Sequence, residues 1–187
     1  MTVSPELDRS FRDAAAAAGL LDVAYDVWDS PVGPLLLAST ERGLCRISFD
    51  PEPEAEVERL ARMHGLRVLR VPKRLDTPRR HLEEYFEGKR EDFELPTDLA
   101  GVPSFQAHVL RELERVPYGS VETYGELARR IGKPRAARAV GGALNRNPVP
   151  IVIPCHRIIG STGSLTGYGG GLERKRALLQ LEGLTLA

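Results

Sequence analysis

The sequence lacks the features that mark membrane, secreted and metal-binding proteins. No apolar run in its 187 residues approaches the roughly 20 residues that a membrane-spanning helix needs. The N-terminal stretch MTVSPELDRSFRDAAAAAGL carries acidic residues and has no leucine-rich core, so it is not expected to be a secretory signal. Four scattered histidines and two cysteines form no cluster with metal-ligand spacing. We therefore expect no membrane association, no metal and no cofactor.

Cysteine is scarce: Cys45 and Cys155 stand far apart in the chain. Without an export signal, a disulfide between them is not expected, and both thiols are interpreted as reduced in a cytoplasmic protein. The placement of Cys45 in a predicted strand suggests burial, but its reactivity is left open.

The net charge of zero conceals an uneven distribution of charge. Residues 1–100 hold 14 Lys and Arg against 20 Asp and Glu, a net charge of −6, whereas residues 101–187 hold 12 against 6, a net charge of +6. A basic half next to an acidic half indicates that the basic half meets a polyanion. Chance segregation of solvated charges is the alternative.

Patterning predicts a sheet-and-helix first domain. Residues 24–50 alternate between apolar and polar side chains around the turns PVG and ERG, which is typical of an antiparallel meander. Residues 54–64 and 77–88 have helical spacing and helix start and stop signals. The polar, proline-bearing stretch KREDFELPTDLAGVP follows, and it places the domain boundary between residues 1–95 and residues 96–187.

The second domain reads as mostly helical. Residues 104–119 carry apolar side chains at three- and four-residue spacing, and Thr123 with Glu126 forms a capping-box signature. A further helix is predicted to start with Pro134 at its first position, and a last helix ends at Gly183. Two short helices joined by GKP indicate a helix-turn-helix whose second helix is the candidate recognition helix.

That candidate recognition helix contains an unusual pair of glycines. Gly141 and Gly142 inside a helix cost about 2 kcal/mol relative to alanine, so close approach of another surface is expected to compensate. With Arg135 and Arg138 on one face, a smooth helix of this kind suits the DNA minor groove. Tight helix–helix packing inside the domain is the alternative.

The stretch PVPIVIPCHR ends in the residues that carry most of the chemistry. Residues 148–154 are predicted to form a short buried strand that delivers Cys155 and His156. A core cysteine is usually inert, but an imidazole that reaches the sulfur directly or through one water would raise the thiolate fraction. Glu182, on the last turn of the final helix, could hold the imidazole tautomer, or it could be a surface glutamate.

The stretch GSTGSLTGYGGGL has six glycines in thirteen residues around Tyr168. Such a loop can arrange backbone N–H groups around a planar ligand while the tyrosine stacks on it. A flexible connector is the alternative.

These motifs together resemble the O6-alkylguanine-DNA alkyltransferases, also called methylated-DNA–protein-cysteine methyltransferases. The resemblance is nearly continuous from SFQAHVL to LLQLEG and is carried by NPVPIVIPCHRIIG, AARAVGGA and GYGGGL. Residues 1–95 match only in general layout. The family often has tryptophan where this chain has Leu110, and the first twenty or so residues have no counterpart that we can place.

The resemblance implies an α/β (α+β) protein: a ribonuclease-H-like sheet-and-helix domain, then a mostly helical, winged helix-turn-helix-type domain. It implies direct DNA repair. O6-alkylguanine is flipped out of duplex DNA, and so is O4-alkylthymine, and the alkyl group of the flipped base passes irreversibly to Cys155 in a single turnover. The implied catalytic residues are Cys155, His156, Glu182, Asn147 and Tyr124. The implied DNA-binding residues are Arg138, Tyr124, Ser161, Arg135, Ala137, Gly141 and Gly142. Tyr168, Ile158, Ile159 and Gly169 would line the base pocket.

The expected partner is double-stranded DNA carrying O6-alkylguanine, bound by a monomer in the cytoplasm. Clustering along DNA, the range of alkyl groups and the role of the N-terminal domain are left open. Two other functions are weighed. A DNA-binding regulator explains the basic half but not Cys155, and a thiol hydrolase with a Cys-His pair does not explain Arg138 beside paired glycines.

Overall fold

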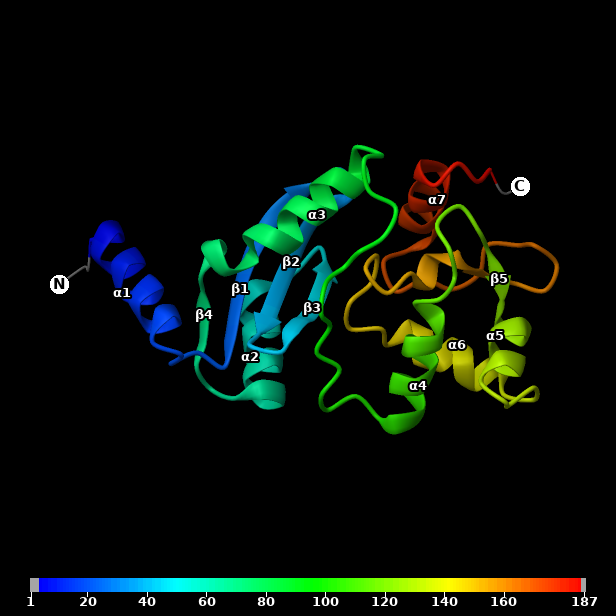
Figure 1. Cartoon of the computed structure of the whole chain (residues 1–187), viewed down its shortest axis with the longest axis horizontal. Helices are drawn as coiled ribbons and strands as arrows, with labels where there is room; N and C mark the ends of the chain where they lie inside the picture. Colours follow the sequence, from blue (N-terminus) through cyan, green and yellow to red (C-terminus); the bar gives the residue numbers. More distant parts are fainter. Residues whose placement is uncertain (1–3, 186–187) are drawn as a thin grey trace. The chain divides into compact units, whose positions relative to one another are not determined.

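The computed structural model describes residues 4–185, which divide into two compact units. The first unit comprises residues up to Glu84 together with Glu94–Asp98, and the second comprises Tyr85–Phe93 and the residues from Leu99 onward. The division therefore runs through the end of helix α3 (Asp76–Phe86), so Tyr85 belongs to the second unit. Figure 1 shows the elements of both units in chain order.

The first unit is built on a four-stranded sheet with the order β3-β2-β1-β4. Strands β1 (Val23–Ser30), β2 (Gly33–Thr40) and β3 (Gly43–Phe49) form the predicted antiparallel meander, and this prediction is confirmed. Strand β4 (Val68–Arg70), which we did not predict, pairs parallel to β1. Three residues give too short an alternation to be found in the sequence.

Helices cover the sheet because its central strand is apolar on both faces. Leu35 to Ala38 of β2 are all buried, as expected for a central strand with both faces covered. The face of Leu36 and Ala38 packs with Leu60 of helix α2 (Pro53–His64) in one core cluster. Helices α2 and α3 confirm the two helices that the sequence predicts, and α1 (Pro5–Ala17) precedes the sheet.

The second unit is mostly helical, as predicted. Helices α4 (Ser104–Leu113), α5 (Tyr124–Arg130) and α6 (Ala137–Asn145) pack on one another, and α7 (Leu172–Leu181) closes the chain. The predicted capping box is present: Thr123 Oγ1 accepts from the Glu126 N–H, and the Glu126 carboxylate accepts from the Thr123 N–H. Two short strands, β5 (Glu122–Thr123) and β6 (Ile158–Ile159), pair in parallel.

One prediction about the second helix of the helix-turn-helix was wrong. Helix α6 begins at Ala137, not at Pro134. Lys133 to Ala136 form a turn in which the Ala136 N–H donates to the Lys133 carbonyl at 2.8 Å, and the residue before a proline disfavours helical backbone. Arg135 therefore lies on this turn and does not share a helical face with Arg138.

The predicted strand over residues 148–154 was also wrong, although the segment is buried as expected. Its three prolines have no N–H to donate to a strand ladder. The chain instead forms a tight loop, in which the Ile153 N–H donates to the Val149 carbonyl at 2.9 Å and only an isolated bridge joins Pro150 to Ile153. Ile151 takes a φ of +74°, a strained conformation for a β-branched residue.

Within residues 4–185, no helix is both long enough and apolar enough to cross a membrane.

Candidate active site

Cys155, His156 and Arg157 form a single turn of 3₁₀ helix (η2), which directly follows the buried loop. All three are nearly inaccessible, with 6 %, 0 % and 4 % of their surface exposed. A 3₁₀ helix has about three residues per turn, so consecutive side chains leave its axis in three directions. One turn can therefore give a thiol, an imidazole and a guanidinium separate partners in the interior.

Asn147 fixes the position of the sulfur. Its Nδ2 donates to the Ile153 carbonyl at 2.8 Å and to Cys155 Sγ at 3.2 Å, while its Oδ1 accepts from the Val149 N–H at 3.0 Å. One amide side chain thus ties both ends of the buried loop and directs an N–H donor at the sulfur. These contacts are compatible with the bracing role that the resemblance predicts for Asn147.

The Cys155 thiol is protonated at rest. Burial raises its pKa to about 11, and the hydrogen bond from Asn147 and the positive charge of Lys175 act in the opposite direction. At neutral pH such a thiol is ionised in only about one molecule in ten thousand. A nucleophilic role for Cys155 therefore requires a base that removes its proton during the reaction.

His156 is the nearest base in sequence, and Glu182 sets its orientation. His156 Nε2 lies 2.7 Å from Glu182 Oε1, which places the ring proton on Nε2 because an ionised carboxylate only accepts. Nδ1 is buried and has no hydrogen-bond partner among the described residues. Burial lowers the pKa of His156, so the imidazole is neutral and its Nδ1 lone pair is unoccupied.

Glu182 is the cap residue that follows α7 rather than part of its last turn. It is not a surface residue, with 4 % exposed. Burial alone would raise its pKa, but the hydrogen bonds and charges of His156 and Arg157 hold that pKa at about 2. Glu182 is therefore ionised and can accept the hydrogen bond from His156.

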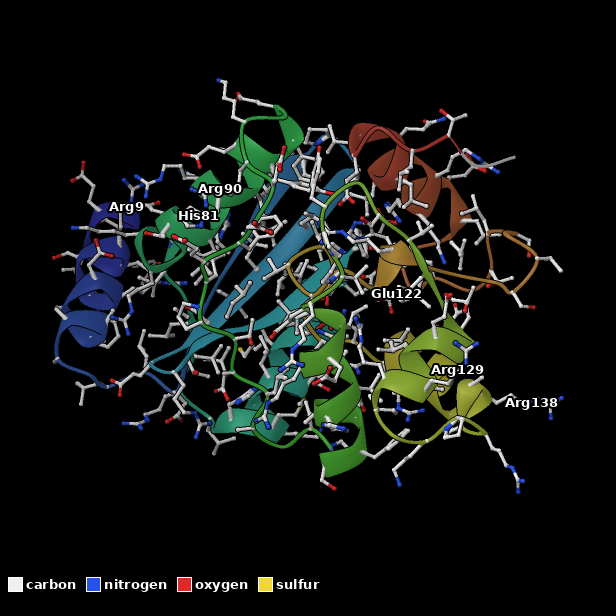
Figure 2. All side chains as sticks on the ribbon, turned by 45° about the vertical axis from the view of Figure 1, so that its right-hand side comes forward. Arg9, His81, Arg90, Glu122, Arg129 and Arg138 are labelled. Atoms are coloured by element: carbon white, nitrogen blue, oxygen red, sulfur yellow. The ribbon has the colours of Figure 1, made fainter. Side chains whose placement is uncertain are left out.

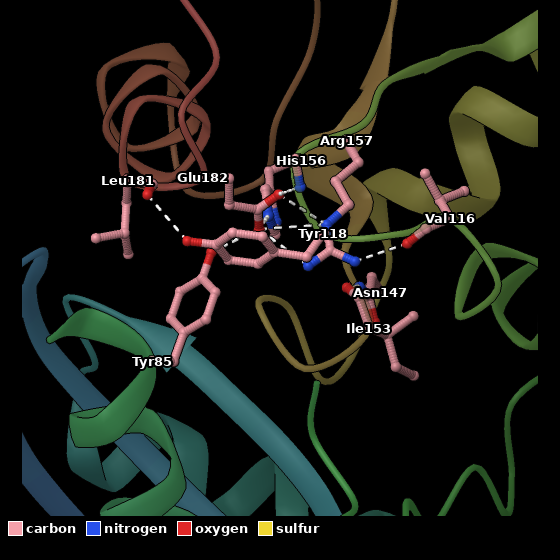
Figure 3. A network of polar contacts seen from close by, with 10 residues as sticks. Tyr85, Val116, Tyr118, Asn147, Ile153, His156, Arg157, Leu181 and Glu182 are labelled. Atoms are coloured by element: carbon pink, nitrogen blue, oxygen red, sulfur yellow. Dashed lines mark hydrogen bonds and ion pairs between the residues drawn. The ribbon is translucent and has the colours of Figure 1, made fainter. Parts of the chain in front are cut away.

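Sequence reasoning missed two partners of Glu182 that Figure 3 shows converging on its carboxylate. Arg157 donates from Nε to Oε2 at 2.9 Å and from Nη2 to Oε1 at 3.0 Å, and Tyr85 donates from its hydroxyl to Oε1 at 2.8 Å. Arg157 stood next to His156 in the motif, so its position was a signal. Tyr85 gave none, because it lies 97 residues from Glu182 in sequence.

Lys175 was missed as well. It is fully buried in α7, and its ammonium donates to the carbonyls of Ile158 and Thr166. Burial lowers its pKa to about 8. The stretch ERKR looks like a solvated helix face, but Lys175 is three residues before Leu178 and shares its buried side.

The glycine-rich loop is anchored at Thr166. Its carbonyl accepts from Lys175 at 2.7 Å and from the Tyr124 hydroxyl at 3.3 Å. Among the candidate pocket residues, Ile158 and Ile159 are buried in β6, Tyr168 is half-buried with its hydroxyl oxygen inside, and Gly169 is exposed on the loop. Lys175 therefore links the strand after the Cys-His-Arg turn to the loop that carries Tyr168.

The candidate DNA-binding side chains lie on the surface of the second unit. Arg138 projects outward from α6 in Figure 2, and Arg135 is exposed on the preceding turn. Ala137 is half-buried at the first position of α6, and Ser161 is exposed on the glycine-rich loop.

The two helical glycines are not required by internal packing. A methyl group added at Gly141 would lie 3.6 Å from the Tyr124 ring, and one at Gly142 would lie 3.8 Å from the Arg146 guanidinium. Both distances are ordinary van der Waals contacts, so the packing alternative does not explain the glycines.

Two family models match consecutive parts of the chain. The ribonuclease-like domain of 6-O-methylguanine DNA methyltransferase matches residues 23–99, and the DNA binding domain of the same enzyme matches residues 104–184. The chain belongs to the 6-O-methylguanine DNA methyltransferase family. The predicted family and the predicted fold class, an α/β protein with a ribonuclease-like domain before a helical DNA-binding domain, are confirmed.

Individual members of this methyltransferase family resemble the chain over most of their length. The methylated-DNA–protein-cysteine methyltransferase of Methanosarcina barkeri is 45 % identical over 84 % of this chain and 96 % of its own. That of Haemophilus influenzae is 43 % identical over 84 % and 85 %. The crystal structure of Mycobacterium tuberculosis OGT in complex with DNA is 41 % identical, with a TM-score of 0.73, over 85 % and 92 %.

Helix α1 lies before residue 23 and thus outside both family matches. Among residues 4–185, no group of three or more His, Cys, Asp or Glu side chains is arranged to hold a metal ion.

Proposed function

We propose that Cys155 is the acceptor that takes the alkyl group from O6-alkylguanine, and from O4-alkylthymine, in double-stranded DNA. Membership of the family makes the reaction class methyl transfer from alkylated DNA to a protein cysteine. The observation that carries the assignment is the environment of the sulfur. Cys155 accepts a hydrogen bond from Asn147, and the next residue is a neutral imidazole oriented by a carboxylate.

The proposed step is a displacement at the alkyl carbon. The sulfur forms a bond to this carbon as the bond between the carbon and O6 breaks, and the electron pair of that bond leaves with the guanine. The thiol proton passes to His156 Nδ1, directly or through one water. The departing guanine takes up one proton from solvent, with Tyr124 donating a hydrogen bond to it, and His156 then returns its extra proton to solvent, so the protons balance. Cys155 ends as a thioether and cannot react again, so each molecule acts once.

Reaching the sulfur requires the damaged base to leave the helix, because the thiol is only 6 % exposed. In this proposal Arg138 fills the gap in the base stack, and Gly141 and Gly142 let α6 approach the minor groove. Tyr168 and the neighbouring residues Ile158, Ile159 and Gly169 receive the base. Phosphate contacts by Arg135, Ser161, Tyr124 and the Ala137 backbone supply affinity that is independent of sequence.

The solved complex of the Mycobacterium tuberculosis relative with DNA supports this partner, and so does the +6 charge of residues 101–187. The protein would act as a monomer in the cytoplasm, where both thiols stay reduced.

The test is intact-protein mass spectrometry after mixing the protein with a duplex that contains one O6-methylguanine. The expected result is a gain equal to one CH₂ group, mapped to Cys155 and saturating at one per protein. Cys45→Ser is the matched control and should gain the same mass. DNA binding without a mass change would support a regulator instead, and repeated repair without modification would support a hydrolase; either result would overturn the proposal.

A further inference from the structure

The carboxylate of Glu182 accepts more hydrogen bonds than the orientation of one imidazole needs. Oε1 accepts from His156 at 2.7 Å, from the Tyr85 hydroxyl at 2.8 Å and from Arg157 Nη2 at 3.0 Å. Oε2 accepts from Arg157 Nε at 2.9 Å and from the Gly119 N–H at 3.2 Å. Figure 3 shows Tyr85 and Arg157 reaching this carboxylate from different elements.

This arrangement has a consequence for charge. An ionised carboxylate beside a histidine favours the imidazolium, which has no lone pair to accept a proton. Arg157, which is 4 % exposed, compensates the charge of Glu182 by pairing with both oxygens. Tyr85 is fully buried and donates to Glu182 Oε1, the same oxygen that accepts from His156. The Tyr85 hydroxyl and the imidazole therefore compete for the lone pairs of Oε1.

We propose that Tyr85 and Arg157 are positioning residues for the transfer: they saturate Glu182, so that it orients His156 without drawing a second proton onto the ring, and Nδ1 stays available to the Cys155 thiol. The inference rests on the proposed role of Cys155 and adds two residues that act through Glu182 without touching the reacting atoms. Burial, together with the charges of Arg157 and Lys175, lowers the pKa of His156, whereas Glu182 raises it.

Arg157 is also held in place by contacts other than those with the Glu182 carboxylate. Its Nη1 donates to the Val116 carbonyl at 2.7 Å, and its guanidinium lies 5.8 Å from the centre of the Tyr118 ring. A guanidinium fixed on three sides keeps its two-pronged geometry toward Glu182. The segment after α4 therefore helps to set the charge at the site.

The groups whose charge acts on His156 come from several elements. Glu182 follows α7, Lys175 lies within it, and Arg157 is the residue after His156. Two tyrosines lie near enough to feel the charge of Glu182: Tyr85, the second-to-last residue of α3, and Tyr118, which follows α4. The pKa of both tyrosines is raised, by burial first and then by the charge of Glu182. They remain neutral donors, and Lys175, with its pKa lowered to about 8, stays mostly charged below neutral pH. Changes on the acid side of neutrality at this site therefore report on His156.

The two tyrosines offer a matched pair of variants. Tyr85→Phe removes the hydroxyl that donates to Glu182. Tyr118→Phe removes a hydroxyl that donates to the Leu181 carbonyl at 3.0 Å instead, and it keeps the ring beside Arg157. Both changes delete one hydroxyl near the end of α7, so a general loss of stability should affect both.

The readouts are the pH dependence of the single-turnover transfer rate and the ¹⁵N NMR titration of the His156 ring. In the wild type, Nε2 should carry the proton and Nδ1 should be bare. In Tyr85→Phe, the lone pair freed on Glu182 should raise the pKa of His156 by roughly half a unit. The acid limb of the rate profile should move to higher pH, which lowers the rate about threefold on that limb, and affinity for DNA should stay unchanged.

Arg157→Lys extends the series, because it keeps the charge but loses the two-pronged contact. It should shift the His156 titration further in the same direction, with thermal unfolding measured to verify the fold. If this variant does not fold, the comparison of Tyr85→Phe with Tyr118→Phe decides the question alone.

An unchanged His156 titration in Tyr85→Phe, an equal shift in Tyr118→Phe, or a ring proton on Nδ1 would each overturn the inference. Failure of the proposed function is distinct, because it would appear as no transfer by the wild type. The NMR titration would still test the inference in that case.

Discussion

Each unit of the molecule buries one cysteine, and burial raises the pKa of both thiols, to about 12 for Cys45 and to about 11 for Cys155. The Cys45 sulfur donates to the Ala38 carbonyl at 3.3 Å, and the negative charge of Asp98 raises its pKa further. The Cys155 sulfur accepts from Asn147, and the charge of Lys175 favours its anion. Burial therefore does not distinguish the two thiols; the direction of the hydrogen bond and the sign of the nearest charge do.

The largest effect should follow from exchanging the sulfur for oxygen in each unit. Cys155→Ser should reduce methyl transfer below detection, because a buried hydroxyl ionises far less readily than a thiol, while binding to damaged DNA persists. Cys45→Ser should transfer one methyl group per protein at the wild-type rate. Transfer by Cys155→Ser, or its loss in Cys45→Ser, would show that the comparison assigns the wrong cysteine. Single-turnover assays with labelled DNA measure both.

A smaller effect is expected when the donor to the sulfur is removed. Asn147→Ala deletes the N–H that points at Cys155 Sγ and leaves the Val149 N–H without its acceptor. Since a hydrogen bond to a charged group contributes about 1.5–3 kcal/mol, thiolate formation should fall about 10- to 100-fold. The rate of Cys155 alkylation by iodoacetamide reports this directly, and Cys45 in the same protein is the internal control. A drop in both rates would indicate a general disturbance.

Removing the positive charge near Cys155 should have a milder, pH-dependent effect. Lys175→Gln keeps an N–H donor for the Ile158 and Thr166 carbonyls but carries no charge. Because the pKa of Lys175 is lowered to about 8, the wild-type amine is charged below that pH and mostly neutral above it. The variant should therefore slow Cys155 alkylation severalfold below pH 8 and little above it. An equal effect at all pH values would mean that the charge of Lys175 is not what matters.

The smallest effect is expected at Cys45. Asp98→Asn removes the negative charge that disfavours the Cys45 thiolate, so the pKa of Cys45 should fall by about a few tenths of a unit. Asp98 also accepts from Thr40 and Arg42, so some loss of stability is expected. The pH dependence of Cys45 alkylation in a Cys155→Ser background measures the shift. Methyl transfer by Asp98→Asn with Cys155 intact should match the wild type.

Local signals predicted much of the fold. The strand meander and the capping box at Thr123 and Glu126 depend on neighbours in sequence, and both are confirmed. The two errors also have local causes: prolines at 148, 150 and 154 prevent a strand ladder, and Pro134 forms a turn rather than a helix start.

The site was predictable only in part, because its contacts join distant segments. Cys155 and His156 were proposed because they stand side by side in a short motif, and Glu182 because its helix follows the loop closely, whereas Asn147 entered through the resemblance. Tyr85 and Lys175 look like ordinary helix residues until the tertiary structure brings them to Glu182 and Ile158.

The buried loop before Cys155 has a consequence for protein engineering. A two-residue turn closes the loop between Pro150 and Ile153, and Asn147 holds both ends of the loop by hydrogen bonds. The loop therefore cannot accommodate an inserted or deleted residue without moving Cys155. Any change of length would redirect the sulfur by a large fraction of a turn. Transfer of this thiol site to another protein therefore requires the whole segment from Asn147 to Arg157. A grafted Cys-His-Arg tripeptide alone should not react with alkylated DNA.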